Sequence, residues 1–255
     1  MALSREQRQI ADQERLLARI DQSPILQQEA DQLLCLPSPS REQVDQAQKL
    51  YRQARRLRRS GAAITPRLEQ HRQTLAWLEA GLTFAEQADS LEQLQELEEE
   101  LDVLQGARRP RNRAQRRHPQ GQEPCPLEVT SDSGLRLQVG RNHRQNDWIS
   151  LRQARRGDLW FHAQECPGSH VVLKASEGLA TELDVQQATD LAAYFSRARG
   201  NRRVAVVMVP AADLQRIAGA TAGTVRHRGG EVLWGEPERA LAMITATSLP
   251  GESGS

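Results

Sequence analysis

Three side chains of metal-binding type recur at four-residue intervals near the middle of this chain of 255 residues. They are His162, Cys166 and His170, the one cluster of zinc-ligand residues that the sequence offers. A four-residue interval aligns side chains on a helix. Here, however, Pro167-Gly168 predicts a turn between two strands. A structural zinc site also needs a fourth ligand, which would have to come from a distant cysteine or histidine. We therefore expect no metal ion and no cofactor.

Ser169 and His170 are the pair that could support nucleophilic catalysis. No acidic residue that would orient the imidazole can be identified. The sequence also has no glycine-rich loop between a strand and a helix of the kind that cradles nucleotide phosphates. The protein is therefore not expected to be an enzyme.

The stretch 139–174 is rich in polar donors, glycines and aromatic residues, which suit contacts to phosphates and unpaired bases. Trp160 alternates with Leu159 and Phe161 along a predicted strand. It either packs in the core or faces outward with His162 as a stacking platform. Asp147 is expected to orient neighbouring arginines. The candidate RNA-binding residues are Arg141, Asn142, Arg144, Asn146, Asp147, Trp160, His162, Gly168, Ser169, His170 and Lys174.

Residues 1–105 have the pattern of a helical arm. Leucines and isoleucines recur at helical spacing on both sides of a turn at 36–40, which predicts an antiparallel helical hairpin of coiled-coil character. A short acidic helix at 91–105 is expected to end at Gly106. Helix restarts are predicted at Ser23-Pro24, with Ser23 as N-cap, and at Thr65-Pro66, and capping boxes at Ser40 with Gln43 and at Ser90 with Gln93.

Five arginines gather on the returning helix of this arm. They either form a solvated helix face or make a contact with an acidic partner, such as an RNA. They are Arg52, Arg55, Arg56, Arg58 and Arg59.

Charge is unevenly distributed, although the net charge is only +1. Residues 1–105 are net acidic, residues 106–120 contain six arginines and no acid, and residues 121–255 are balanced. The Arg/Pro-rich segment 106–126 is predicted to be a flexible linker, acting either as a basic tether for RNA or as a spacer.

From Leu127 to residue 247 the pattern changes to short strands with one main helix. A hairpin is predicted around 131–134, a helix at 145–154 capped by Asn146 or Asp147, and the main helix at 183–199. A buried strand at 203–209 and a final hairpin that pairs 223–227 with 231–235 follow. Residues 248–255 are expected to be a disordered tail. The fold class is α+β: a helical arm followed by a small α+β domain.

The three cysteines are far apart and odd in number, which favours a reducing compartment over a disulfide framework. No apolar run approaches the roughly 20 residues that span a bilayer, and the first residues lack the apolar core of a signal peptide. We therefore expect a cytoplasmic protein that does not use a membrane.

Four motifs in order carry a family resemblance: VGRN at 139–142, QND at 145–147, DLWFHA at 158–163 and PGSHVVLK at 167–174. They resemble the RNA-binding domain of the NFACT family, and the arm is similar to that family's middle coiled coil. The strand 204–209 departs from the family, because it reads VAVVMV where relatives carry an acidic and an aromatic residue.

The resemblance implies binding to ribosomal RNA, to tRNA or peptidyl-tRNA, and to the large ribosomal subunit obstructed by peptidyl-tRNA. No counterpart of the family's N-terminal NFACT domain is recognised before the arm. We therefore expect that domain to be lacking or to be a separate chain, and we do not expect this chain alone to extend a stalled peptide. The alternative is a coiled-coil interaction module whose globular domain binds a protein rather than RNA.

Overall fold

The computed structural model describes residues 1–106 and 123–248. A helical arm precedes a small domain in which an antiparallel sheet is combined with helices, which confirms the predicted α+β class. The contacts divide the chain into two compact units, Met1–Leu78 and Glu79–Ser255. The second unit therefore begins inside the arm, well before the predicted start of the small domain at residue 127.

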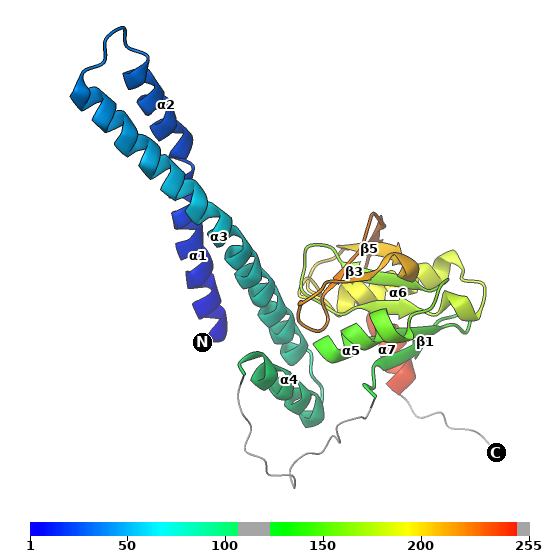
Figure 1. The fold of residues 1–255 in the computed structure, drawn as a ribbon. Coiled ribbons are helices and arrows are strands. Elements are labelled where there is room, and N and C mark those ends of the chain that lie inside the picture. The colour runs from blue at the N-terminus through cyan, green and yellow to red at the C-terminus, as the bar shows by residue number, and fades with distance from the viewer. Residues whose placement is uncertain (107–122, 249–255) are drawn as a thin grey trace, which may run out of the picture. The chain divides into compact units, whose positions relative to one another are not determined.

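The first unit is the predicted helical hairpin. Helices α1 (Ala2–Ile20) and α2 (Ser23–Leu34) run along α3 (Arg41–Glu86), as Figure 1 shows. Small side chains fill the seam, since Ala30, Ala47 and Ala54 are fully buried. Polar contacts fix the register, among them the bond from Ser23 Oγ to the carbonyl oxygen of Ala54 (3.0 Å).

Among the predicted caps and helix restarts of the arm, one of those described next was confirmed and two were wrong. Ser40 and Gln43 form the expected reciprocal bonds at the start of α3. The restart at Pro66 was wrong, because α3 continues through it. α1 packs against α3 on both sides of that position: Ile20 touches Gly61, and Glu6 contacts His71. This packing offsets the loss of one helical hydrogen bond at proline. Ser23 is not the N-cap of α2, which is Gln22.

Helix α4 (Leu91–Leu104) is the predicted acidic helix and belongs to the second unit. Ser90 caps it by accepting a hydrogen bond from the backbone N–H of Gln93 (3.3 Å). Gly106 has φ +64, so it takes the left-handed conformation that commonly ends a helix.

A six-stranded antiparallel sheet with the order β1-β2-β4-β3-β5-β8 is the core of the second unit. Helices α6 (Glu182–Tyr194) and α7 (Pro237–Ser248) belong to this part of the chain, and α6 packs on one sheet face through Leu191 and Ala192. The predicted main helix ended five residues too late, and α7 was not predicted. The strands are β1 (Leu127–Thr130), β2 (Arg136–Val139), β3 (Leu159–Ala163), β4 (Val171–Leu173), β5 (Val204–Pro210) and β8 (Glu231–Gly235).

The opposite sheet face carries a second, smaller core. Ile149 packs there on Trp160, Val172, Val207 and Val209. The covering elements are α5 (His143–Trp148), the π-helix η2 (Ile149–Gln153), and the short pair β6 (Gln215–Arg216) and β7 (Val225–Arg226). The remaining elements in the described residues are two 3-10 turns, η3 (Ala175–Glu177) and η4 (Ala211–Asp213).

The predicted pairing of the last hairpin was wrong. β7 pairs with β6, whereas β8 pairs with β5. Gly229 and Gly230 lie between β7 and β8 at φ +65 and +124, and they let the chain cross the sheet face. At Gly230 a Cβ would lie 2.7 Å from Val207 Cγ2. Within residues 1–106 and 123–248, no helix is long and apolar enough to cross a membrane.

Candidate nucleic-acid interface

Asn142, in the VGRN motif, is the N-cap of α5. Asn142 is extended (φ −157), and its Oδ1 accepts a hydrogen bond from the N–H of Gln145 at 2.8 Å. The predicted caps, Asn146 and Asp147, lie inside the helix instead, so that prediction was wrong. Asn142 therefore stabilises α5 through its side chain.

Two carboxylates of α4 bind this helix start. Glu96 accepts a hydrogen bond from Asn142 Nδ2 at 2.6 Å. Glu100 accepts from the backbone N–H groups of His143 (3.2 Å) and Arg144 (2.8 Å), and its Oε2 lies 2.8 Å from His143 Nδ1. Glu100 is buried, so these donors replace water around its charge. Sequence reasoning missed both residues. Their spacing of four on an acidic helix was the available signal.

Asn146 joins α5 to the turn before β4. Its Oδ1 accepts from the backbone N–H of His170 at 2.9 Å, and its Nδ2 points to the Gly168 carbonyl oxygen at 3.5 Å. Gly140 leaves the space that Asn146 fills, because a Cβ there would lie 2.2 Å from Asn146 Oδ1. Gly168 packs closely on Ser196 in the same way. These motif residues hold the fold together.

The guanidinium of Arg141 is engaged within the second unit. It donates to the carbonyl oxygen of Gln87 (3.2 Å), lies 3.1 Å from Asp89 Oδ2 and rests over the ring of Phe195. Its predicted RNA contact would have to displace these partners.

Trp160 and two histidines form a cluster on the second sheet face. Trp160 is 2% exposed, so of its two predicted placements the packed one is observed. Its Nε1 donates to Ser150 Oγ (3.1 Å), which lies 2.8 Å from His170 Nδ1. The Trp160 ring stacks on His162 at 5.7 Å between centroids. Burial lowers the pKa of His162 to about 4, and burial together with His162 holds the pKa of His170 well below its ordinary value.

These histidine shifts predict that stability falls on mild acidification. An unfolded histidine binds its proton near pH 6.5, whereas folded His162 does so near pH 4. The unfolded chain therefore gains protons first as pH falls through this window. At pH 5, His162 alone is expected to cost about 2 kcal/mol of unfolding free energy relative to pH 7. Urea unfolding at the two pH values measures this.

The replacement His162→Gln is the control for that prediction and should make the loss between pH 7 and pH 5 smaller. The carboxyls of Asp158, Asp184 and Glu177 do not interfere, because their lowered pKa values place their titration below this window. Equal stability of the unsubstituted protein at both pH values would contradict the prediction.

Lys174 forms a buried ion pair. It is 3% exposed, and its Nζ contacts Asp158 Oδ2 (2.5 Å) and the Gln153 carbonyl oxygen (3.0 Å). Burial raises the pKa of Asp158, but hydrogen bonds from Lys174, Ser176 and Arg155 outweigh it, and the net pKa is lowered. The predicted RNA contact of Lys174 does not fit a side chain with no free surface.

The described residues that were considered for metal binding or catalysis are not arranged as a metal site or as a nucleophile with its base. Ser169 is buried, and its Oγ has no hydrogen-bond partner in the described chain. Cys166 Sγ contacts its neighbour's carbonyl oxygen, Pro167 O (3.6 Å). In the two described ranges, no group of three or more His, Cys, Asp or Glu residues could hold a metal ion.

Exposed arginines cover the outer side of α5 and η2. Arg144 is exposed, and Arg152, Arg155 and Arg156 follow it on η2 and the loop before β3. Their guanidinium groups make no ion pair with a described residue, whereas Asp147 binds Arg216 (2.7 Å). We call Arg144, Arg152, Arg155 and Arg156 the α5 arginine surface. The buried motif residues position the backbone that carries it.

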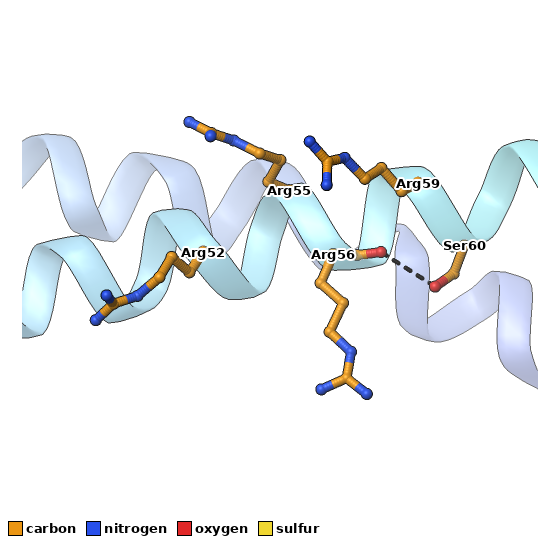
Figure 2. A pocket seen from close by; sticks show the side chains of 5 residues that line it. All are labelled: Arg52, Arg55, Arg56, Arg59 and Ser60. Atoms are coloured by element: carbon orange, nitrogen blue, oxygen red, sulfur yellow. Dashed lines mark hydrogen bonds between the residues drawn. The ribbon is translucent and has the colours of Figure 1, made fainter.

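A second set of arginines lines a shallow pocket on α3 together with Ser60, as Figure 2 shows. The spacing of three and four residues places these arginines on one helix face, away from buried Ala54. Arg58, predicted with them, instead donates to Gln27 Oε1 at 2.9 Å. We call this set the α3 arginine surface; it consists of Arg52, Arg55, Arg56 and Arg59.

Comparisons with known proteins match both halves of the chain. Residues 37–120 match the family model "NFACT N-terminal and middle domains", and residues 128–229 match "NFACT protein RNA binding domain". The first match does not bear out our expectation that the N-terminal NFACT part is lacking, because the matching model includes that part.

Relatives agree with these matches. "Rqc2 homolog RqcH" of Streptococcus suis is 34% identical over 73% of this chain and 33% of its own length, and that of Bacillus subtilis is 36% identical over 42% and 19%. The chain thus spans about a third of the length of the first of these relatives.

A solved structure is also similar: the C-terminal part of the fibronectin/fibrinogen-binding protein from Streptococcus suis. It has a TM-score of 0.77 and 29% identity, over 94% of this chain and 92% of that one. Two models of one family together match most of its residues, and these matches and the relatives support an assignment of this chain to the NFACT family.

Proposed function

We propose that this chain binds RNA on the large ribosomal subunit when that subunit is obstructed by peptidyl-tRNA. The observation that carries the proposal is the match of residues 128–229 to an RNA-binding domain. The names of the relatives, homologues of Rqc2, support a role in ribosome quality control. Ribosomal RNA and the tRNA of the peptidyl-tRNA are the RNA partners.

The two arginine surfaces support this proposal physically. Each surface holds four guanidinium groups without an acidic partner among the described residues. The positive charges within each surface therefore repel one another. RNA phosphates would relieve that repulsion, and arginine binds phosphate oxygens through two parallel hydrogen bonds. Neutralising phosphates releases counterions, so the binding should weaken steeply with salt.

The proposal includes no catalytic step, no cofactor and no extension of a stalled peptide by this chain alone. A cytoplasmic place of action also belongs to the proposal.

Removing either arginine surface is expected to weaken binding to large subunits about 10- to 100-fold, because contacts to phosphates are lost. Each lost contact should also lower the salt slope by roughly 0.7–0.9. The test is co-sedimentation with subunits that are empty or carry peptidyl-tRNA, across a salt series. One variant replaces Arg144, Arg152, Arg155 and Arg156 with alanine, and the other replaces Arg52, Arg55, Arg56 and Arg59.

The matched control removes the same charge between α6 and β5, from Arg197, Arg199, Arg202 and Arg203. Three of these already contact Glu79, Tyr194 or Glu236. The control should bind nearly as the unsubstituted chain does. Binding that ignores both salt and the two variants would favour the interaction module, whose leucine-rich contacts persist at high salt.

A further inference from the structure

An exposed tryptophan lies on the edge strand of the sheet. Trp234 of β8 is 53% exposed and Val232 is 46% exposed. Trp234 pairs directly with Ala205, and Val232 with Val207. Residues two apart on a strand, and residues directly opposite each other, share a sheet face. Trp234 and Val232 therefore extend the face that carries Trp160, beyond the part that α5, η2 and the β6–β7 pair cover.

His162 belongs to the same face. It pairs with Val207, which pairs with Val232 on the other side. Two strand spacings separate His162 from β8, or roughly 10 Å. Its side chain is partly exposed, and its lowered pKa keeps the ring neutral at pH 7. A neutral imidazole offers one donor and one acceptor, as the edges of nucleobases do. Backbone hydrogen bonds with Gly168 and Ala163 already engage this ring, which leaves one of its two groups for a base.

We propose that Trp234 is a stacking platform for an unpaired RNA base, with the imidazole of His162 positioned to meet the edge of a neighbouring base. Exposed aromatic side chains on an open sheet face bind single-stranded RNA in this manner in other folds. The inference rests on the proposed function and specifies its ligand as unpaired nucleotides. Trp234 lies outside the segment 128–229 that the RNA-binding model matches.

Charge on the neighbouring loop favours RNA as the occupant. The connection from β7 to β8 crosses this face, since Gly230 contacts Val207 and Val209 and His227 lies 5.7 Å from Trp160. Arg226 and Arg228 flank His227, are exposed, and make no ion pair with a described residue. They can neutralise the phosphates of a strand whose bases lie on the sheet.

The edge of β8 is less suited to a peptide. A peptide strand would add to β8 through its free backbone groups. The carbonyl oxygen of Trp234 already accepts a hydrogen bond from Gln186 Nε2 at 3.0 Å. The side-chain face, rather than the backbone edge, therefore remains available.

The test compares a single-stranded RNA of about 10 nucleotides with a blunt RNA duplex of equal length, chosen because one platform needs few nucleotides. Trp234→Ala is expected to weaken binding of the single strand about 5- to 150-fold, the measured range for losing one stacked base. Duplex affinity and the salt slope should stay unchanged. Trp234→Phe should keep most of the affinity. Leu179→Ala removes another exposed apolar side chain, far more exposed at 92%, and should have no effect.

The outcomes separate this inference from the proposed function. If the unsubstituted chain binds neither the single strand nor the duplex, both the proposed function and the stacking platform are overturned. If it binds single strands and Trp234→Ala binds them equally well, only the platform is overturned. Equal weakening for the single strand and the duplex also overturns the platform. Thermal unfolding of each variant identifies a folding defect, and in that case Trp234→Phe decides: a full loss of single-strand binding by a folded Trp234→Phe overturns the platform.

Discussion

Replacing Lys174 with methionine is expected to lower the free energy of unfolding by about 3–5 kcal/mol at pH 7, the usual cost of breaking a buried ion pair. Methionine has a similar length but no charge. The Asp158 carboxylate, fully buried, would lose its only partner of opposite charge among the described residues. The backbone N–H groups of Arg155 and Ser176 would remain as its donors. Urea unfolding monitored by circular dichroism measures the change.

The double variant Lys174→Met with Asp158→Asn is the control for this prediction. Asparagine removes the buried charge and keeps one acceptor oxygen. The N–H groups of Arg155 and Ser176 bond to different oxygens of Asp158, so one of them loses its acceptor. The double variant should still recover part of the lost stability, because a neutral pair avoids the desolvation cost of the buried charge. If both variants are equally unstable, the uncompensated charge is not the cause and the explanation fails.

Placing a methyl group at Gly140 is expected to lower the free energy of unfolding by about 2–6 kcal/mol. In Gly140→Ala the new Cβ would lie 2.2 Å from Asn146 Oδ1 and 2.7 Å from the Asn146 backbone nitrogen. The backbone of α5 has to move, which costs about 1–3 kcal/mol by overpacking. The His170 N–H would also lose its acceptor on Asn146, which costs about 1–3 kcal/mol more.

Gly200→Ala is a matched control, since the same methyl group there would meet no atom within 4 Å. Its effect should stay within about 0.5 kcal/mol, as is usual for surface substitutions. Heat and urea unfolding of the two variants side by side measure the difference. Similar stabilities for Gly140→Ala and Gly200→Ala would refute the close approach of Gly140 to Asn146.

Local patterns predicted local structure well. The capping residues Ser40 and Ser90, the β1–β2 hairpin and the helical hairpin all depend on neighbours within a short span or on a repeated apolar spacing. Pro66 shows where this reasoning fails. A proline normally ends a helix, but α1, more than 40 residues earlier in the chain, holds α3 together across it.

The candidate site was harder to predict for a physical reason. Polar residues are usually exposed, so Asn142, Asn146 and Lys174 were interpreted as surface contacts. Their burial depends on partners from distant elements: Glu96 for Asn142, and the turn before β4 for Asn146. A sequence without such pairings in view cannot separate a buried polar network from a binding surface. The exposed arginines beside these motifs were visible in the sequence, but the freedom of their guanidinium groups was not.

The hydrogen bonds that Glu96 and Glu100 accept at the start of α5 affect where this chain can be divided into domains. α4 is joined to the rest of the second unit in two ways: by the continuous chain, and by these two side chains, which bind the start of α5. Because α4 and its binding site are parts of one chain, the effective concentration of α4 at that site is raised. If the chain were cut between α4 and β1, the two pieces would still recognise each other. The domain boundary that the sequence suggests, at residues 106–126, therefore lies inside the second compact unit and not between two units.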